Sequence, residues 1–157
     1  MQRTWTLSCE KSEKPLNQGV IMQIEQLIEN LSSELKLEAV PQKDKKGLYQ
    51  LKVGSSPQVS IKELDPGVFF EARILPIPKE GNKEALFIYL MKANLLGQGT
   101  GGAAIGIDPS EKFFTLTLTL PFEINYRTFH ESLEDYLNYI DYWKEEVTTF
   151  MEKGFMQ

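Results

Sequence analysis

The sequence is almost without cysteine and histidine, since Cys9 and His130 are the only residues of their kinds among 157. A lone cysteine excludes a disulfide within the chain. One cysteine and one histidine also cannot supply the four nitrogen and sulfur ligands of an ordinary zinc site. The composition therefore predicts no structural metal.

Long hydrophobic runs are missing as well. No apolar stretch in the sequence approaches the roughly 20 residues that a membrane-spanning helix needs. The first residues, Met1 to Lys11, lack the continuous apolar segment of a secretory signal peptide. We therefore expect no membrane insertion and a cytoplasmic location.

Positive charge is not in excess. The formal net charge is -5 at pH 7 and the pI is near 5.0, so the chain should repel phosphate backbones, and nucleic acid is not an expected partner. Hydrophobic residues make up 41% and charged residues 25%, as in soluble globular proteins. At this length the chain is expected to form one domain with its own core, and its partners are expected to be proteins.

Recognisable catalytic motifs are absent, including G-x-S-x-G and H-E-x-x-H. Carboxylates such as Glu131 and Glu134 are close enough in sequence to form acid and base pairs, but they fall on the polar side of an amphipathic helix. We interpret them as a solvated face, and His130 beside them as a surface residue. No enzyme activity is predicted.

Three glycines, Gly97, Gly99 and Gly102, satisfy the spacing G-x-G-x-x-G. In a dinucleotide site this loop follows a strand and opens a helix whose N-terminal amides bind the pyrophosphate. Here a helical pattern precedes the loop and a strand pattern follows it. We therefore interpret the glycines as a helix end and a strand start, and predict no cofactor.

The first half of the chain predicts a helix followed by three strands. Residues 1–16 are polar and are interpreted as an N-terminal extension, and a single domain is expected over residues 17–153. Short segments rich in Val, Ile, Phe and Tyr at 48–53, 59–64 and 68–74 are typical of antiparallel strands. The first helix begins near Asn17 and its apolar face is expected to contain Val20, Ile24, Leu27, Ile28, Leu31 and Leu35.

The second half predicts helix, strand, strand, helix. Asn82 can cap a helix over residues 83–96, a strand follows from Ala103, and residues 113–120 alternate between apolar side chains and threonine. Thr128 and Glu131 fit a capping box that would start the last, long helix. The whole order is α-β-β-β-α-β-β-α, which is typical of an α+β domain.

The stretch from Leu95 to Pro121 carries a more specific signal. Asn94-Leu95-Leu96 ends the predicted helix, Gly101-Gly102-Ala103-Ala104 leads into a strand, Asp108-Pro109 forms a turn and Leu118-Thr119-Leu120-Pro121 ends the next strand. This arrangement resembles the class I chaperones of bacterial type III secretion, the family that includes the Tir chaperone. The resemblance covers roughly residues 17–150 and implies a twisted antiparallel sheet flanked by helices.

The resemblance also implies a function. Members of this family bind the N-terminal segment of secreted effectors in the bacterial cytoplasm and keep it extended and competent for export. By position, the effector-binding groove is expected at Ile21, Ile24, Ile28 and Leu31 of the first helix and at Tyr49, Leu51, Val59 and Ile61 of the first two strands.

The same resemblance implies a dimer built mainly on the second helix and the strand beside it. Candidate interface residues are Ile88, Met91, Leu95 and Ala104. The expected partners are secreted effector proteins and a second chaperone subunit, identical or related, with possible contact to the secretion ATPase. Two alternatives stay open: a protein-interaction domain of this fold without a secretion role, and a small-ligand regulator that uses tyrosines of the last helix.

Overall fold

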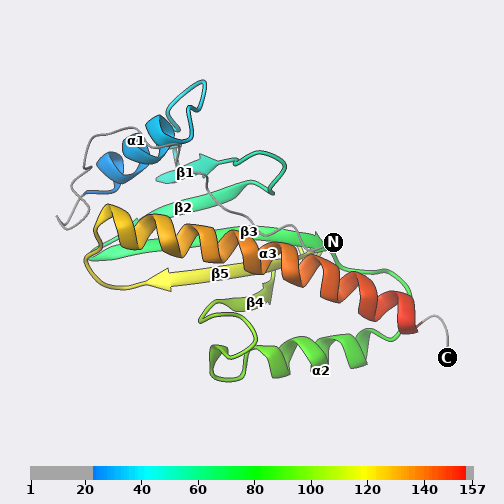
Figure 1. Ribbon diagram of the computed structural model, residues 1–157. Helices are drawn as coiled ribbons and strands as arrows, with labels where there is room; N and C mark the ends of the chain where they lie inside the picture. The colour runs from blue at the N-terminus through cyan, green and yellow to red at the C-terminus, as the bar shows by residue number, and fades with distance from the viewer. Residues whose placement is uncertain (1–22, 155–157) are drawn as a thin grey trace.

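The computed structural model of the protein describes residues 23–154, which form three α-helices, a short 3-10 turn and one five-stranded sheet (Figure 1). The predicted α+β class and order of elements are confirmed within this range. The N-terminal extension and the first part of the predicted first helix lie outside the described residues. The elements are α1 (Ile24–Glu34), β1 (Leu48–Leu51), β2 (Val59–Leu64), β3 (Gly67–Pro76), α2 (Lys83–Ala93), η1 (Leu95–Gly97), β4 (Ala104–Ile107), β5 (Phe113–Leu120) and α3 (Tyr126–Gly154).

The strands form an antiparallel sheet in the order β1-β2-β3-β5-β4. Figure 1 shows α3 running across this sheet, with α1 near β1 at one side and α2 beyond β4 at the other. The two strands within the stretch from Leu95 to Pro121, β4 and β5, therefore lie on the α2 side of the molecule. The two shorter helices are placed at opposite ends of the strand order.

The turn between β2 and β3 depends on a glycine. Gly67 has a φ of +104°, and a Cβ built on it would lie 1.8 Å from the backbone oxygen of Leu120. Only glycine allows both this backbone conformation and this close approach of β3 to the end of β5. The Asp-Pro-Gly sequence that predicted a break between the strands thus also sets how tightly they meet.

One face of the sheet and the three helices enclose the core. Along β5, Phe114 and Leu116 are buried and Thr119 on the other face is exposed, as the period-two pattern predicts. Thr115 on that other face departs from the pattern, because only 4% of its surface is exposed. Phe70 of β3 lies at the centre, with ring centroids 5.8 Å from Phe129 and 5.5 Å from Tyr136 of α3. The Tyr136 hydroxyl donates a hydrogen bond to the Leu116 carbonyl at 2.5 Å, so α3 is fixed to the sheet by a polar contact within apolar packing.

The predicted start of α3 was wrong by a few residues. The helix begins at Tyr126, and the side-chain oxygen of Asn125 accepts a hydrogen bond from the Thr128 backbone N–H at 2.9 Å. Asn125 therefore has the N-cap contact that had been expected of Thr128. Glu131 is not part of a capping box and instead pairs with Arg127, at 2.9 Å between Oε1 and Nε.

The predicted second helix ends earlier than its apolar pattern indicates. Asn82 caps it as predicted, since its side chain accepts from the Ala85 N–H at 3.0 Å, but the α-helical conformation stops at Ala93. Leu95 to Gly97 form η1, in which Leu96 has a φ of 56°.

Among residues 23–154 no helix is both long enough and apolar enough to span a bilayer.

Candidate functional site

The residues predicted to line an effector groove lie in the core. Seven of the eight fall among the described residues, each with at most 4% of its surface exposed, and Ile21 lies outside the described range. The amphipathic pattern of α1 is real, but its apolar face packs on the sheet and on α3. These buried residues are Ile24, Ile28, Leu31, Tyr49, Leu51, Val59 and Ile61.

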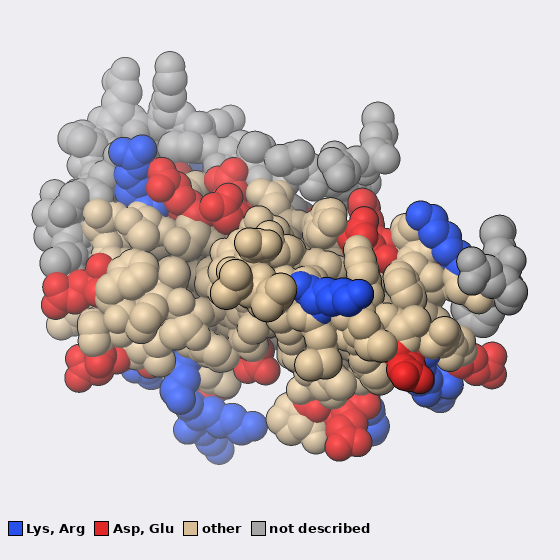
Figure 2. Space-filling view, turned by 90° about the horizontal axis from the view of Figure 1, so that it is seen from below, with Lys and Arg blue, Asp and Glu red and all other residues tan. Residues whose placement is uncertain are grey.

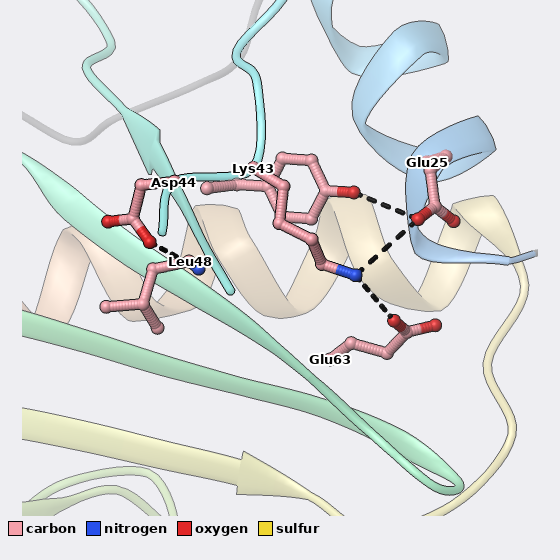
Figure 3. A network of polar contacts seen from close by, with 6 residues as sticks. Glu25, Lys43, Asp44, Leu48 and Glu63 are labelled. Carbon is pink, nitrogen blue, oxygen red and sulfur yellow. Dashed lines mark hydrogen bonds and ion pairs between the residues drawn. The ribbon is translucent and has the colours of Figure 1, made fainter. Parts of the chain in front are cut away.

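A polar network on the rim of this region ties α1 to the first two strands (Figure 3). The Lys43 ammonium lies 3.1 Å from Glu63 Oε2 on β2 and 3.7 Å from Glu25 Oε1 on α1. The Tyr49 hydroxyl of β1 donates a hydrogen bond to the same Glu25 oxygen at 3.1 Å. One lysine thus joins a helix, a loop and a strand, although all three charged side chains remain partly in solvent.

The network shifts the pKa values of its members in the directions that hold it together at neutral pH. The pKa of Glu25 is lowered, first by a hydrogen bond from the backbone and then by Tyr49 and Lys43. The pKa of Lys43 is raised, mainly by its hydrogen bond to Glu63. Burial raises the pKa of Tyr49. The carboxylate, the ammonium and the neutral phenol are therefore the forms present near pH 7.

A small pocket opens beside this network, at the N-terminal end of α1. Its volume is about 140 Å³, below the size of typical small-molecule sites. Leu27, Leu64 and Pro66 contribute apolar surface, and Glu63 and Glu123 contribute carboxylates. The pocket can receive one apolar side chain of a peptide more readily than a whole metabolite.

The sequence predicts that the single histidine, His130, is a surface residue, but the structure places it in a contact between helices. His130 retains only 17% side-chain exposure, with Nε2 3.8 Å from Glu34 Oε1 of α1 and Nδ1 3.9 Å from Glu134 Oε2 of α3. The Tyr126 hydroxyl donates a hydrogen bond to the other Glu34 oxygen, Oε2. His130 therefore belongs to the contact between α1 and α3, because α1 covers the first turns of α3.

The second surface surrounds α2, where large apolar side chains remain in solvent. Ile88, Met91 and Leu95, here called the apolar stripe, are exposed by 48%, 73% and 65%. Their spacing of three and four residues places them on one side of the helix and its extension. Ala104 of β4 is exposed too, so all four residues predicted for a dimer interface lie at the surface.

Figure 2 shows the side of the molecule that carries α2 and β4. Uncharged side chains cover much of its middle, with a basic side chain among them, and most other charged side chains lie toward the edges of the view. Two further large apolar side chains of the neighbouring elements η1 and β4 are also exposed, Leu96 by 84% and Ile107 by 48%. Large contiguous apolar areas on a soluble protein mark interaction surfaces.

The opposite side of α2 anchors the helix. Leu86 and Leu90 are buried, and the Tyr89 hydroxyl donates a hydrogen bond to Glu146 Oε2 of α3 at 2.5 Å. The Tyr89 ring also stacks on Phe150, with 5.2 Å between centroids. The hydrogen bond to the Glu146 carboxylate, followed by burial, raises the pKa of Tyr89 to about 12. Glu146 of α3 is thus a contact of α2 and not simply a solvated carboxylate.

The aromatic residues of α3 do not form a ligand cleft of useful size. Tyr136 and Trp143 are buried in the core, and the pocket beside Tyr139 has a volume of about 110 Å³. Trp143 Nε1 donates to the Gly99 carbonyl at 3.1 Å, so the indole holds the glycine-rich loop.

Within residues 23–154, no group of three or more His, Cys, Asp or Glu side chains is arranged to hold a metal ion.

Comparison with known proteins agrees with this architecture. The sequence profile of the Tir chaperone protein (CesT) family matches residues 26–144. A protein of Chlamydia pneumoniae is 24% identical over 125 residues, which are 79% of this chain and 95% of that relative. Because the family profile covers most of the chain, the protein belongs to the Tir chaperone family, and the resemblance inferred from the sequence is confirmed.

Solved structures share the fold at low sequence identity. One chain of the ExsC-ExsE complex has a TM-score of 0.66 and 18% identity, covering 78% of this chain and 91% of that chain. The HopA1-SchA chaperone-effector complex gives a TM-score of 0.59 at 14% identity, covering 78% and 93%. The heterodimeric ExoU-SpcU complex from the type III secretion system of Pseudomonas aeruginosa gives 0.57 at 11%, covering 83% and 99%. At these identities the likeness concerns the fold.

Proposed function

We propose that this protein is a cytoplasmic type III secretion chaperone that binds the N-terminal chaperone-binding segment of one or more effectors and keeps it extended for export. The observation that carries the proposal is family membership over residues 26–144 together with a fold shared with chains of chaperone and effector complexes. The exposed apolar surface around α2 supports it, because such surfaces serve protein contacts. We do not propose an enzymatic activity for this protein.

The effector segment is proposed to cross the side of the molecule formed by α1, β1 and β2. The residues predicted to line the groove are buried and lie beneath this surface. The effector is therefore proposed to contact the residues around them, where the pocket between α1 and the β2–β3 turn offers apolar surface. An extended segment that orders on binding must offset roughly 2–5 kcal/mol of ordering free energy. A pocket of this size covers only one side chain, so the contact has to continue along α1.

A second copy of the chain is proposed to cover the apolar stripe. Burying a large aliphatic side chain stabilises an interface by roughly 1.5–3 kcal/mol. Ile88, Met91 and Leu95 have 48% or more of their surface available for this, and a twofold axis would use each of them twice. A related chaperone in place of the second copy is the other outcome that a mass measurement would reveal.

The test is co-expression with candidate secreted proteins of the same bacterium, followed by purification and light scattering. A complex of two chaperone subunits with one effector, lost when the effector lacks its N-terminal segment, is expected. Leu64→Asp, which puts a carboxylate into the α1 pocket, should weaken capture while the thermal unfolding of the free protein stays cooperative. Failure to capture any secreted protein under conditions that support secretion contradicts the proposal.

A further inference from the structure

Within residues 23–154, β4 is the last strand of the sheet and pairs with one strand, β5. In an antiparallel ladder the backbone groups of alternate residues point to opposite sides. The Asp108 N–H bonds to the Phe113 carbonyl at 3.0 Å, so Ala104 and Gly106 share its direction toward β5. The backbone groups of Ala103, Ile105 and Ile107 therefore point away from the sheet, where a strand from another molecule would add.

The side chain of Asn94 occupies this edge at Ile105. Asn94 Oδ1 accepts a hydrogen bond from the Ile105 N–H at 2.7 Å, and Asn94 Nδ2 donates to the Ile105 carbonyl at 2.8 Å. A carboxamide carries one acceptor and one donor group side by side, and a residue of a neighbouring antiparallel strand likewise presents its C=O and its N–H on one side. Asn94 thus satisfies both groups that an added strand would need at this position.

Thr100 occupies the same edge two residues earlier. Its carbonyl accepts from the Ala103 N–H at 3.1 Å, and its hydroxyl donates a hydrogen bond to the Ala103 carbonyl. Thr100 is fully buried. The outward N–H and C=O groups of Ala103 and Ile105 are therefore bonded within the chain. For Ile107, the last outward residue of β4, the part of the chain that the structure describes offers no such bond.

The glycine-rich loop explains how Thr100 reaches this place. Gly97, Gly101 and Gly102 have φ values of 66°, 61° and 87°, and the Gly102 N–H bonds to the Gly97 carbonyl at 3.1 Å. A Cβ on Gly97 would lie 2.9 Å from the Gly102 Cα, so the two turns of the loop touch backbone to backbone. The spacing that looks like a nucleotide fingerprint instead folds the chain back along β4.

We propose that Asn94 and Thr100 act as a built-in substitute for a neighbouring strand and close the β4 edge to strand addition, by an effector segment or by a second copy. The inference rests on the proposed function only for the nature of the partner. Its consequence is that partners meet this side of the molecule through side chains of the apolar stripe. Extension of the sheet by a partner strand is excluded at β4.

The first test measures amide hydrogen exchange at Ile105 by NMR in the full-length protein, in Asn94→Ala and in Asn94→Asp. Asn94→Ala removes both bonds, and the Ile105 amide should exchange about tenfold faster in dilute solution. Asn94→Asp keeps the acceptor and the volume but loses the donor, so the increase should be smaller. Gln98→Ala, an exposed change in the same loop, is the control and should behave as the wild type. An Ile105 amide that exchanges equally slowly in Asn94→Ala overturns the inference.

The second test measures association by analytical ultracentrifugation over a range of protein concentrations. Asn94→Ala should form species larger than those of the wild type, and the Ile105 amide should be protected again within them. Faster exchange without any new association contradicts the inference, because the edge would then be open and still unused. If Asn94→Ala unfolds, Asn94→Asp provides the same two measurements.

The background Met91→Glu separates this inference from the proposed dimer. The single variant Met91→Glu is expected to be monomeric, and the double variant Met91→Glu/Asn94→Ala is expected to associate again. This result would show that strand addition at β4 is distinct from packing on the apolar stripe. If Met91→Glu keeps the size of the wild type while Asn94→Ala still opens the edge, the proposed dimer surface is wrong and the closed edge stands.

Discussion

Helices α1 and α2 are both eleven residues long, yet they treat their apolar side chains in opposite ways. In α1 the apolar residues Ile24, Leu27 and Leu31 are almost completely buried. In α2 only Leu86 and Leu90 are buried, while Ile88 and Met91 remain in solvent. The difference teaches that α1 completes the core of one subunit, whereas α2 is attached to that core and presents a second apolar side outward.

The attachments differ accordingly. α1 is covered by the sheet and α3 and has polar contacts on both sides, through Lys43 on one side and through Glu34 with His130 on the other. α2 is held by two buried leucines and by the Tyr89 hydrogen bond to Glu146. Substitutions on the two helices should therefore affect different properties, namely the free energy of unfolding for α1 and association for α2.

The largest expected effect on stability comes from Leu31→Ala in α1. Leu31 is fully buried, so removing its side chain should lower the free energy of unfolding by about 2–5 kcal/mol. Urea denaturation at a fixed protein concentration measures this. Met91→Ala in α2 is the matched control, and at dilutions where the protein is monomeric it should change the same quantity by less than about 0.5 kcal/mol. Equal losses in the two variants would remove the distinction between the helices.

The next largest effect is expected on association, from Met91→Glu. A carboxylate in the centre of the apolar stripe cannot be buried without a partner. We expect the dissociation constant of the self-complex to rise at least about a hundredfold, with an unchanged circular dichroism spectrum. Sedimentation equilibrium provides the measurement, and Glu84→Gln on the exposed first turn of α2 is the control.

A smaller effect is expected from Tyr89→Phe, which removes the hydrogen bond between α2 and α3. At neutral pH the loss should be about 1 kcal/mol of unfolding free energy. The pKa of Tyr89 is raised to about 12 in the folded protein, so its contribution is fully present below the unfolded value near 10 and is lost as pH rises toward 12. The variant should therefore lose stability less steeply than the wild type between pH 10 and 12.

Other tyrosines, including Tyr49 and Tyr136, also have raised pKa values and contribute to the alkaline loss in both proteins. The comparison therefore concerns the difference between the two unfolding curves. Parallel curves over this pH range would show that Tyr89 does not couple α2 to α3.

The smallest effect is expected from Lys43→Met at the rim of α1. Lys43 and its two glutamate partners are all more than 40% exposed, and exposed ion pairs add little stability because water and salt screen them. The midpoint of thermal unfolding should fall by less than in Tyr89→Phe, and the difference should shrink further in high salt. A larger and salt-independent loss would mean that the Lys43 ammonium, 5.8 Å from the centroid of the Tyr49 ring, also stabilises the protein through that ring.

Much of the fold was predictable because it depends on local patterns. The alternation in β5 predicted its buried face, and Asn82 predicted the start of α2, since both features involve neighbours in sequence. The start of α3 was not predicted correctly. Asn125 and Thr128 both suit an N-cap, and the choice depends on where the chain leaves β5 and meets α1.

The candidate site was less accessible to sequence reasoning. Ile24, Ile28 and Leu31 have the same amphipathic spacing whether they line a groove or pack in a core. The role of Asn94 was hidden as well, because its partners are the backbone N–H and C=O of Ile105, eleven residues away, which have no side-chain signature.

The sequence by itself determined the order of the elements, the apolar side of each and the membership of the Tir chaperone family, because periodicity, turn residues and short motifs are properties of adjacent residues. Only the tertiary structure decided which apolar sides are covered and which remain open. Burial depends on what lies opposite a face, and for α1 and α2 that is set by segments distant in the chain: α3 and the sheet cover α1, whereas the apolar stripe of α2 lies in solvent.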